Sequence, residues 1–82
     1  MSILIKLSTT LRDLVPGYDP ETGLQVLLGE GESSFTAGEL ADRIGIPHKE
    51  IKIVMINSRQ SDLEASVVDG DRVAYFPAVG GG

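Results

Sequence analysis

Apolar residues recur at every second position near the start of the chain, at Ile3, Ile5 and Leu7. This period of two predicts a strand over residues 2–8 with one buried face. A second apolar run, at residues 51–56, is almost unbroken. Such runs are typical of a strand in the middle of a sheet, where both faces are covered.

Two more segments have strand-like patterns. Residues 72–77 alternate strongly, so Val73 and Tyr75 are expected to point into the core while Phe76 points away from it. An exposed aromatic side chain in this place is a candidate contact for a partner protein. Residues 24–28 predict a further strand.

One segment carries clear helix signals. Thr36 is a favourable N-cap, and Glu39 three residues later completes a capping box. A helix is therefore expected over about residues 37–44, with residues 34–36 leading into it. Gly45 is suited to the position after the last turn, and Pro47 prevents continuation. The apolar residues that follow the helical spacing are Leu40, Ala41 and Ile44.

The remaining segments predict short elements and turns. A short helix is expected over residues 11–15, and residues 18–23 read as a surface loop. Residues 57–60 have turn chemistry, residues 61–68 predict an irregular strand or loop, and residues 69–71 predict a tight turn. One long helix among several strands favours an α+β fold in which the helix packs on one face of a sheet.

Composition narrows the possible functions. A chain of 82 residues forms one small domain. Its formal net charge of −5 argues against nucleic acid, since phosphates require a basic surface. The chain has no cysteine and a single histidine, His48, so neither a thiolate metal site nor any other metal centre is expected. With no signal-like or membrane-spanning segment, a soluble, cytoplasmic protein is expected.

The sequence closes on Val79 followed by three glycines, Gly80, Gly81 and Gly82. Glycine has no Cβ, so such a segment is costly to order but passes through channels too narrow for side chains. A frayed tail is one explanation. The other is a terminus that enters the active site of a partner.

The segment from Asp69 to Gly82 resembles the closing segment of the ubiquitin-like sulfur carriers. These include the small subunit of molybdopterin synthase (MoaD) and the thiamin sulfur carrier (ThiS). Their usual ending is an Asp-Gly-Asp turn, a hydrophobic strand, a Pro-containing bend and a terminal Gly-Gly. Residues 5–14 are also similar to the first strand of the molybdopterin group and the Leu-Arg-containing helix that follows it, and residues 53–57 are similar to the third strand of the family. The whole chain most resembles the MoaD-like branch.

The resemblance implies a β-grasp fold, with a mixed sheet of four or five strands and one main helix. It divides the chain into a single β-grasp domain at residues 1–79 and a flexible glycine tail at residues 80–82. In the family, an ATP-dependent ubiquitin-activating-type adenylyltransferase adenylates the terminal glycine carboxylate, here Gly82. A sulfur donor then converts it to a thiocarboxylate.

In the molybdopterin branch, the thiocarboxylate delivers sulfur to a synthase subunit that builds the molybdenum or tungsten cofactor. We expect Gly81 and the extra glycine Gly80 to belong to the segment that inserts into a partner, and Phe76, Pro77 and Val79 to contact that partner. No catalytic residue and no bound cofactor are expected in the chain itself, which makes it a carrier rather than an enzyme.

Three alternatives remain open: sulfur transfer for thiamin synthesis, conjugation of Gly82 to target lysines as a protein modifier, and an inert interaction module. Ser8 stands where molybdopterin-type carriers often have an aromatic residue, so the standard synthase interface is not assured.

Overall fold

The computed structural model describes residues 2–27 and 34–77 of the chain. Its elements, in order along the chain, are β1 (Ser2–Leu7), η1 (Thr9–Leu14), β2 (Leu24–Leu27), β3 (Ser34–Thr36), α1 (Ala37–Ile44), η2 (His48–Glu50), β4 (Ile51–Ile56), β5 (Arg59–Ser61), β6 (Ser66–Val68) and β7 (Arg72–Pro77). The short helices η1 and η2 are of the 3-10 type. The last residue of the strand expected at residues 24–28, and the glycine tail, lie outside the described residues.

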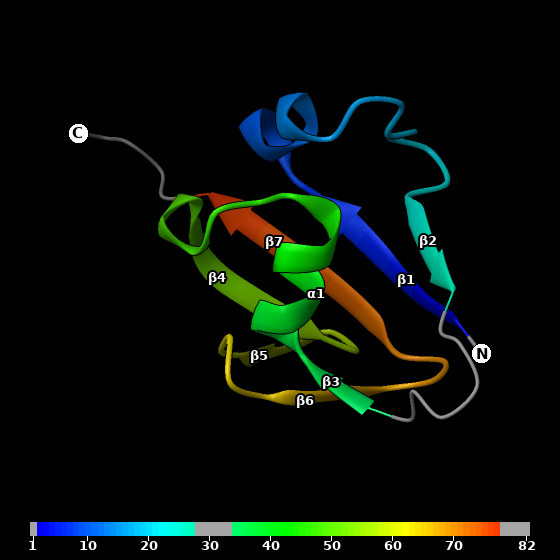
Figure 1. Cartoon of the computed structure of the whole chain (residues 1–82), viewed down its shortest axis with the longest axis vertical. Coiled ribbons are helices and arrows are strands. Elements are labelled where there is room, and N and C mark those ends of the chain that lie inside the picture. Colours follow the sequence, from blue (N-terminus) through cyan, green and yellow to red (C-terminus); the bar gives the residue numbers. More distant parts are fainter. Residues whose placement is uncertain (1, 28–33, 78–82) are drawn as a thin grey trace.

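A five-stranded sheet in the order β2-β1-β7-β4-β5 forms one layer, and α1 packs across one face of it (Figure 1). Strands β1 and β7 run parallel side by side, with Leu4 opposite Arg72 and Leu7 opposite Tyr75. All other pairings in this sheet are antiparallel. The mixed sheet with one helix and two neighbouring terminal strands confirms the expected α+β arrangement.

The end of β1 is completed by side chains rather than by a strand. The pairing of β1 with β2 stops at Ile5, opposite Leu24. Beyond it, the Leu7 N–H donates to the Tyr18 hydroxyl at 2.8 Å, and Arg12 Nε donates to the Leu7 carbonyl at 3.0 Å. Because an unpaired backbone group is costly where water is excluded, these two contacts stabilise the last residue of β1.

Helix α1 has the termini that its sequence predicts. The Thr36 hydroxyl accepts from the Glu39 N–H at 3.1 Å, and a Glu39 carboxylate oxygen accepts from the Thr36 N–H at 2.9 Å. Gly45 ends the helix with a φ of 88°, a conformation that favours glycine. Leu40 is fully buried and Ile44 packs against the core, as predicted.

The connection between β4 and β5 is tighter than the sequence indicates. Residues 59 and 60 were expected in a turn, but they belong to β5. Asn57 and Ser58 alone form the loop, with φ values of 52° and 69°. Two successive positive φ values match the right-handed twist of an antiparallel hairpin, so two residues suffice to reverse the chain.

The structure has a second sheet, of two strands, that the sequence did not predict. Residues 34–36 were expected only to lead into the helix, but they form β3 and pair antiparallel with β6. Phe35 lies opposite Val67, which is fully buried. Strands of three residues show too little periodicity to be recognised, and this pairing joins residues that are 30 or more positions apart.

None of the helices in the described ranges is long and apolar enough to cross a membrane. The core lies between α1 and the sheet, and its largest fully buried side chains are Tyr75, Ile3, Ile5, Leu11, Leu40, Ile46, Val67 and Val73.

We predict that Leu40→Ala lowers the free energy of unfolding by about 2–5 kcal/mol, because it leaves a cavity under α1. Urea unfolding followed by circular dichroism measures this. Leu27→Ala is the matched control, since Leu27 is 73% exposed, and its effect should stay below about 0.5 kcal/mol. Equal losses in the two variants would contradict the packing described here.

Candidate partner-binding site

Near the end of β7, a buried side chain is followed directly by an exposed one. Tyr75 is fully buried, whereas Phe76 is 37% exposed. Phe76 lies opposite Ile53 of β4, and Pro77 lies opposite Ile51 at the start of the same strand. Strand β7 is therefore held on both sides, by β1 and β4, as far as Tyr75, and its last two residues pair with β4 alone.

The Tyr75 hydroxyl ties β7 to the start of α1. It donates to the Ala37 carbonyl at 2.6 Å in a buried setting. Burial raises the pKa of Tyr75 above its ordinary value, and the negative charge of Asp42 acts in the same direction. A neutral hydroxyl therefore holds the helix against the strand that leads to the glycines.

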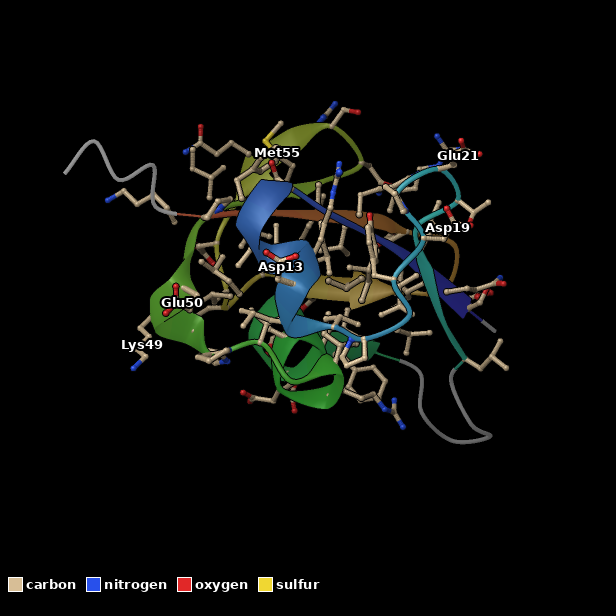
Figure 2. All side chains as sticks on the ribbon, turned by 90° about the horizontal axis from the view of Figure 1, so that it is seen from above. Asp13, Asp19, Glu21, Lys49, Glu50 and Met55 are labelled. Atoms are coloured by element: carbon tan, nitrogen blue, oxygen red, sulfur yellow. The ribbon has the colours of Figure 1, made fainter. Side chains whose placement is uncertain are left out.

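The sheet has a second face, away from α1. Figure 2 shows Met55 on this side of the sheet, with α1 on the opposite side. We call this surface the outward sheet face. It has an apolar centre and a basic margin, and its lining residues include Leu4, Met55, Ala74, Phe76, Lys6 and Arg72. They enclose a shallow depression of about 330 Å³.

The Asp-Gly-Asp turn is structural. One Asp71 carboxylate oxygen accepts from the Val68 N–H, and the other accepts from the Asn57 amide, both at 2.9 Å. The Asp69 carboxylate accepts from the Ser2 N–H at 2.6 Å. Since all three contacts lie inside the chain, both carboxylates serve to fix the start of β7 beside β1 and β4.

His48 joins η2 to α1. Its Nε2 lies 2.9 Å from the Gly38 carbonyl oxygen and 3.0 Å from a carboxylate oxygen of Asp42. Across the described ranges, no three histidine or acidic side chains gather in a way that would hold a metal ion. The contacts of His48 are those of a residue that fastens one short element to another.

Comparison with known proteins identifies the family. Residues 1–80 match the model of the family described as Mut7-C ubiquitin. The chain belongs to the Mut7-C ubiquitin family. This match confirms the resemblance to ubiquitin-like proteins that the first and last segments indicate. No curated protein matches the chain.

Two solved structures share the fold of this Mut7-C ubiquitin family member. The crystal structure of SAMP1 from Haloferax volcanii has a TM-score of 0.67 and 22% identity, with both chains covered in full. The solution structure of the Haloferax volcanii HVO 2177 protein has a TM-score of 0.69 and 20% identity. That match covers all of this chain and 87% of the other. The mixed sheet and single helix, together with these neighbours, confirm the β-grasp architecture.

The structure places only part of the predicted site. Phe76 and Pro77 lie together at the end of β7, with Phe76 exposed as predicted. Val79 and the residues Gly80, Gly81 and Gly82 lie outside the described residues. Sequence reasoning missed two basic residues of the outward sheet face, Lys6 and Arg72. Because they alternate with the buried Ile5 and Val73, the sequence pattern already indicates that both point outward.

We predict that the free energy of unfolding falls above about pH 10 because of Tyr75. In that range the unfolded chain loses the Tyr75 proton while the native chain keeps it, so raising the pH favours unfolding. Below pH 10 both states are protonated and the contribution is fully present. Urea midpoints between about pH 9 and pH 11 should drop more steeply for the native sequence than for Tyr75→Phe. Parallel pH profiles would contradict the assignment.

Proposed function

We propose that this member of a ubiquitin-like family is a sulfur carrier whose Gly82 carboxylate is activated and converted to a thiocarboxylate. The proposal rests on the end of β7, where a strand that is fixed in the fold is followed by a run of glycines. Tyr75 is buried and hydrogen-bonded to α1, and Pro77 still pairs with β4. Five residues later the sequence reaches Gly82 through a run of glycines.

This arrangement suits delivery of a backbone carboxylate to a partner. Five residues extend about 16 Å at ~3.3 Å per residue, enough to reach a buried active site from the rim of the sheet. Glycine allows the segment to lie close to the walls of such a channel. The pairing of Pro77 with β4 fixes the point from which the segment starts.

The chemistry needs no side-chain nucleophile from this chain. A carboxylate oxygen of Gly82 attacks the α-phosphate of ATP and releases pyrophosphate, which forms an acyl-adenylate. A sulfide-level donor then attacks the carbonyl carbon, and AMP leaves. The product is a thiocarboxylate, which is the nucleophile for the next step. The lack of cysteine in the chain is compatible with this route.

Within this class we favour molybdopterin synthesis as the destination of the sulfur. The similarity at residues 5–14 supports this branch, because a helix with a Leu-Arg pair follows the first strand. In the structure that helix is η1, and its Arg12 donates to the last residue of β1. The partners we propose are a ubiquitin-activating-type adenylyltransferase and a sulfur-accepting synthase subunit. We place this ATP-dependent chemistry in the cytoplasm.

A protein modifier is the second candidate, favoured by the match to a family described as ubiquitin. The same acyl-adenylate serves both functions, since a lysine amine of a target can displace the activated carboxylate instead of sulfide. The product is then an isopeptide bond. Lysine adducts isolated from cells would identify this outcome.

We predict that a ubiquitin-activating-type enzyme from the same genome, with ATP and sulfide, raises the intact mass of this protein by about 16 Da, because sulfur replaces oxygen in a chain without thiols. Mass spectrometry of the whole protein measures the shift. Adding one Phe after Gly82 should abolish the shift, since proximity and orientation of the reacting atom dominate such steps.

A Phe added before Met1 is the matched control, and it should leave the mass shift unchanged. Thermal unfolding of both extended proteins checks that the domain is intact. Conversion of the C-terminally extended protein at the normal rate would remove Gly82 from the proposal. A lack of any conversion in the native sequence would overturn the carrier function itself.

A further inference from the structure

The backbone around the end of β7 differs from that along the rest of the strand. As far as Tyr75, β7 pairs with β1 on one side and with β4 on the other. The Ser8 N–H still donates to the Tyr75 carbonyl at 3.2 Å, and the chain then turns into η1. Among the strands that the structure describes, Phe76 and Pro77 pair with β4 alone, beside the start of that strand (Figure 1).

The same stretch of β4 contains a bulge. Ile53 lies opposite Phe76, but Pro77, one position later in β7, lies opposite Ile51, two positions earlier in β4. Lys52 is thus an extra residue without a partner in β7. An extra residue in one strand bends that strand and increases its local twist. The bend therefore coincides with the last two residues of β7.

Burial along β4 indicates the bulge independently. Val54 is buried and Ile56 packs against the core, as alternate residues on one face of a strand should. In a regular strand, Lys52 would be the next residue on the core face and Ile51 would face away from it. Instead, Ile51 packs against the core and Lys52 is exposed. The extra residue thus keeps a charge out of the core and lets an apolar side chain pack there.

Proline suits the position opposite the bulge. Because proline has no N–H to donate, a sheet accepts it beside a bulge or where a neighbouring strand is missing. The Tyr75 carbonyl faces β1, so by alternation the nitrogen of Pro77 faces the side that β1 has left. Proline also restricts its own φ to about −65°. The chain therefore leaves the sheet from a residue with a restricted backbone, next to a bent segment of β4.

We propose that the bulge at Lys52 sets the direction in which the chain leaves β7, and that Lys52 is a positioning residue for the reaction at Gly82. The inference rests on the proposed function, in which this direction serves delivery of the Gly82 carboxylate. Lys52 acts through its backbone, as one extra residue between Ile51 and Ile53. Its ammonium group makes no hydrogen bond or ion pair within the described part of the chain, so it is not required.

The direction matters because the segment after Pro77 is long compared with the precision that the reaction needs. Five residues extend about 16 Å at ~3.3 Å per residue. A change of about 20° at the start, similar to the twist between neighbouring strands, would move the end of the extended segment by roughly 5 Å. A misplacement of only about 1 Å can slow a reaction about 100-fold. A fixed direction therefore favours productive entry of the carboxylate.

The first test separates the backbone of Lys52 from its side chain. Deletion of Lys52 removes the bulge, yet it leaves Ile51 on the core face and opposite Pro77, because one residue fewer restores regular alternation with Val54. Lys52→Ala is the matched control, since it keeps the residue and removes only the ammonium group. Conversion of both variants by the activating enzyme, ATP and sulfide is followed by intact mass.

The deletion should lower kcat by about tenfold or more and change KM by less than about twofold, because the carboxylate is misplaced while most of the domain surface is unchanged. Lys52→Ala should stay within about twofold of the native sequence in both constants, as expected for an exposed side chain.

A spectroscopic measurement tests the direction without the enzyme. The chain has no cysteine, so Asp13→Cys, at an exposed position of η1, can carry a single nitroxide label. Paramagnetic broadening of the amide signals of Gly80, Gly81 and Gly82 should differ between the deletion variant and the native sequence. Lys52→Ala should reproduce the native pattern. A loss of stability alone would not change this pattern in a folded domain.

Thermal unfolding checks that each variant is folded. If the deletion variant does not unfold cooperatively, insertion of one Gly after Lys52 takes its place, since a larger bulge also changes the direction and should lower kcat similarly. A normal kcat in the folded bulge variant, an equal loss in Lys52→Ala, or unchanged broadening would overturn the inference. Failure of the two proposals is distinguishable. No conversion of the native sequence contradicts the carrier function, while the broadening still tests the bulge. Normal conversion of the deletion variant contradicts this inference alone.

Discussion

The parallel pairing of β1 with β7 is the constraint on which the rest of the structure depends. It joins Leu4 to Arg72 and Leu7 to Tyr75, residues almost at opposite ends of the chain. Closing so long a loop costs entropy before any contact repays it. The buried side chains of both strands and the Tyr75 hydroxyl contact with α1 offset that cost. Once the pair has formed, its two edges and two faces fix the positions of β2, β4 and the helix.

The features that sequence reasoning predicted are those encoded within a few residues. The capping box at Thr36 and Glu39 and the terminating Gly45 lie within one helix, and the alternation of Val73, Tyr75 and Phe76 lies within one strand. The pairing of β3 with β6 was missed, because it depends on contacts between distant segments and each strand has only three residues. The role of Arg12 was missed for a related reason. Its acceptor, the Leu7 carbonyl, becomes unpaired only because β2 stops short.

In the candidate site, too, local features could be predicted and features that depend on distant segments could not. The exposure of Phe76 could be predicted from alternation within β7. The pairing of Lys6 and Arg72 across one apolar patch could not, because it depends on the register between strands that are separated by most of the sequence. Each residue alone reads as an ordinary surface charge. Only the sheet shows that no carboxylate lies in any of its strands to balance them.

Among the described residues, the two groups whose pKa values are clearly shifted both stabilise the fold. Strongly perturbed pKa values often mark groups that react. Here the pKa of Asp19 is lowered by the Glu21 and Thr22 backbone N–H groups that its carboxylate accepts from in a turn, and the pKa of Tyr75 is raised by burial. Neither group lines the outward sheet face, and each acts on the fold. If the reacting atom is a backbone carboxylate, as we propose, no side chain of this domain needs a shifted pKa. The sheet then has only to present the partner with a fixed surface and a fixed point from which the glycine segment begins.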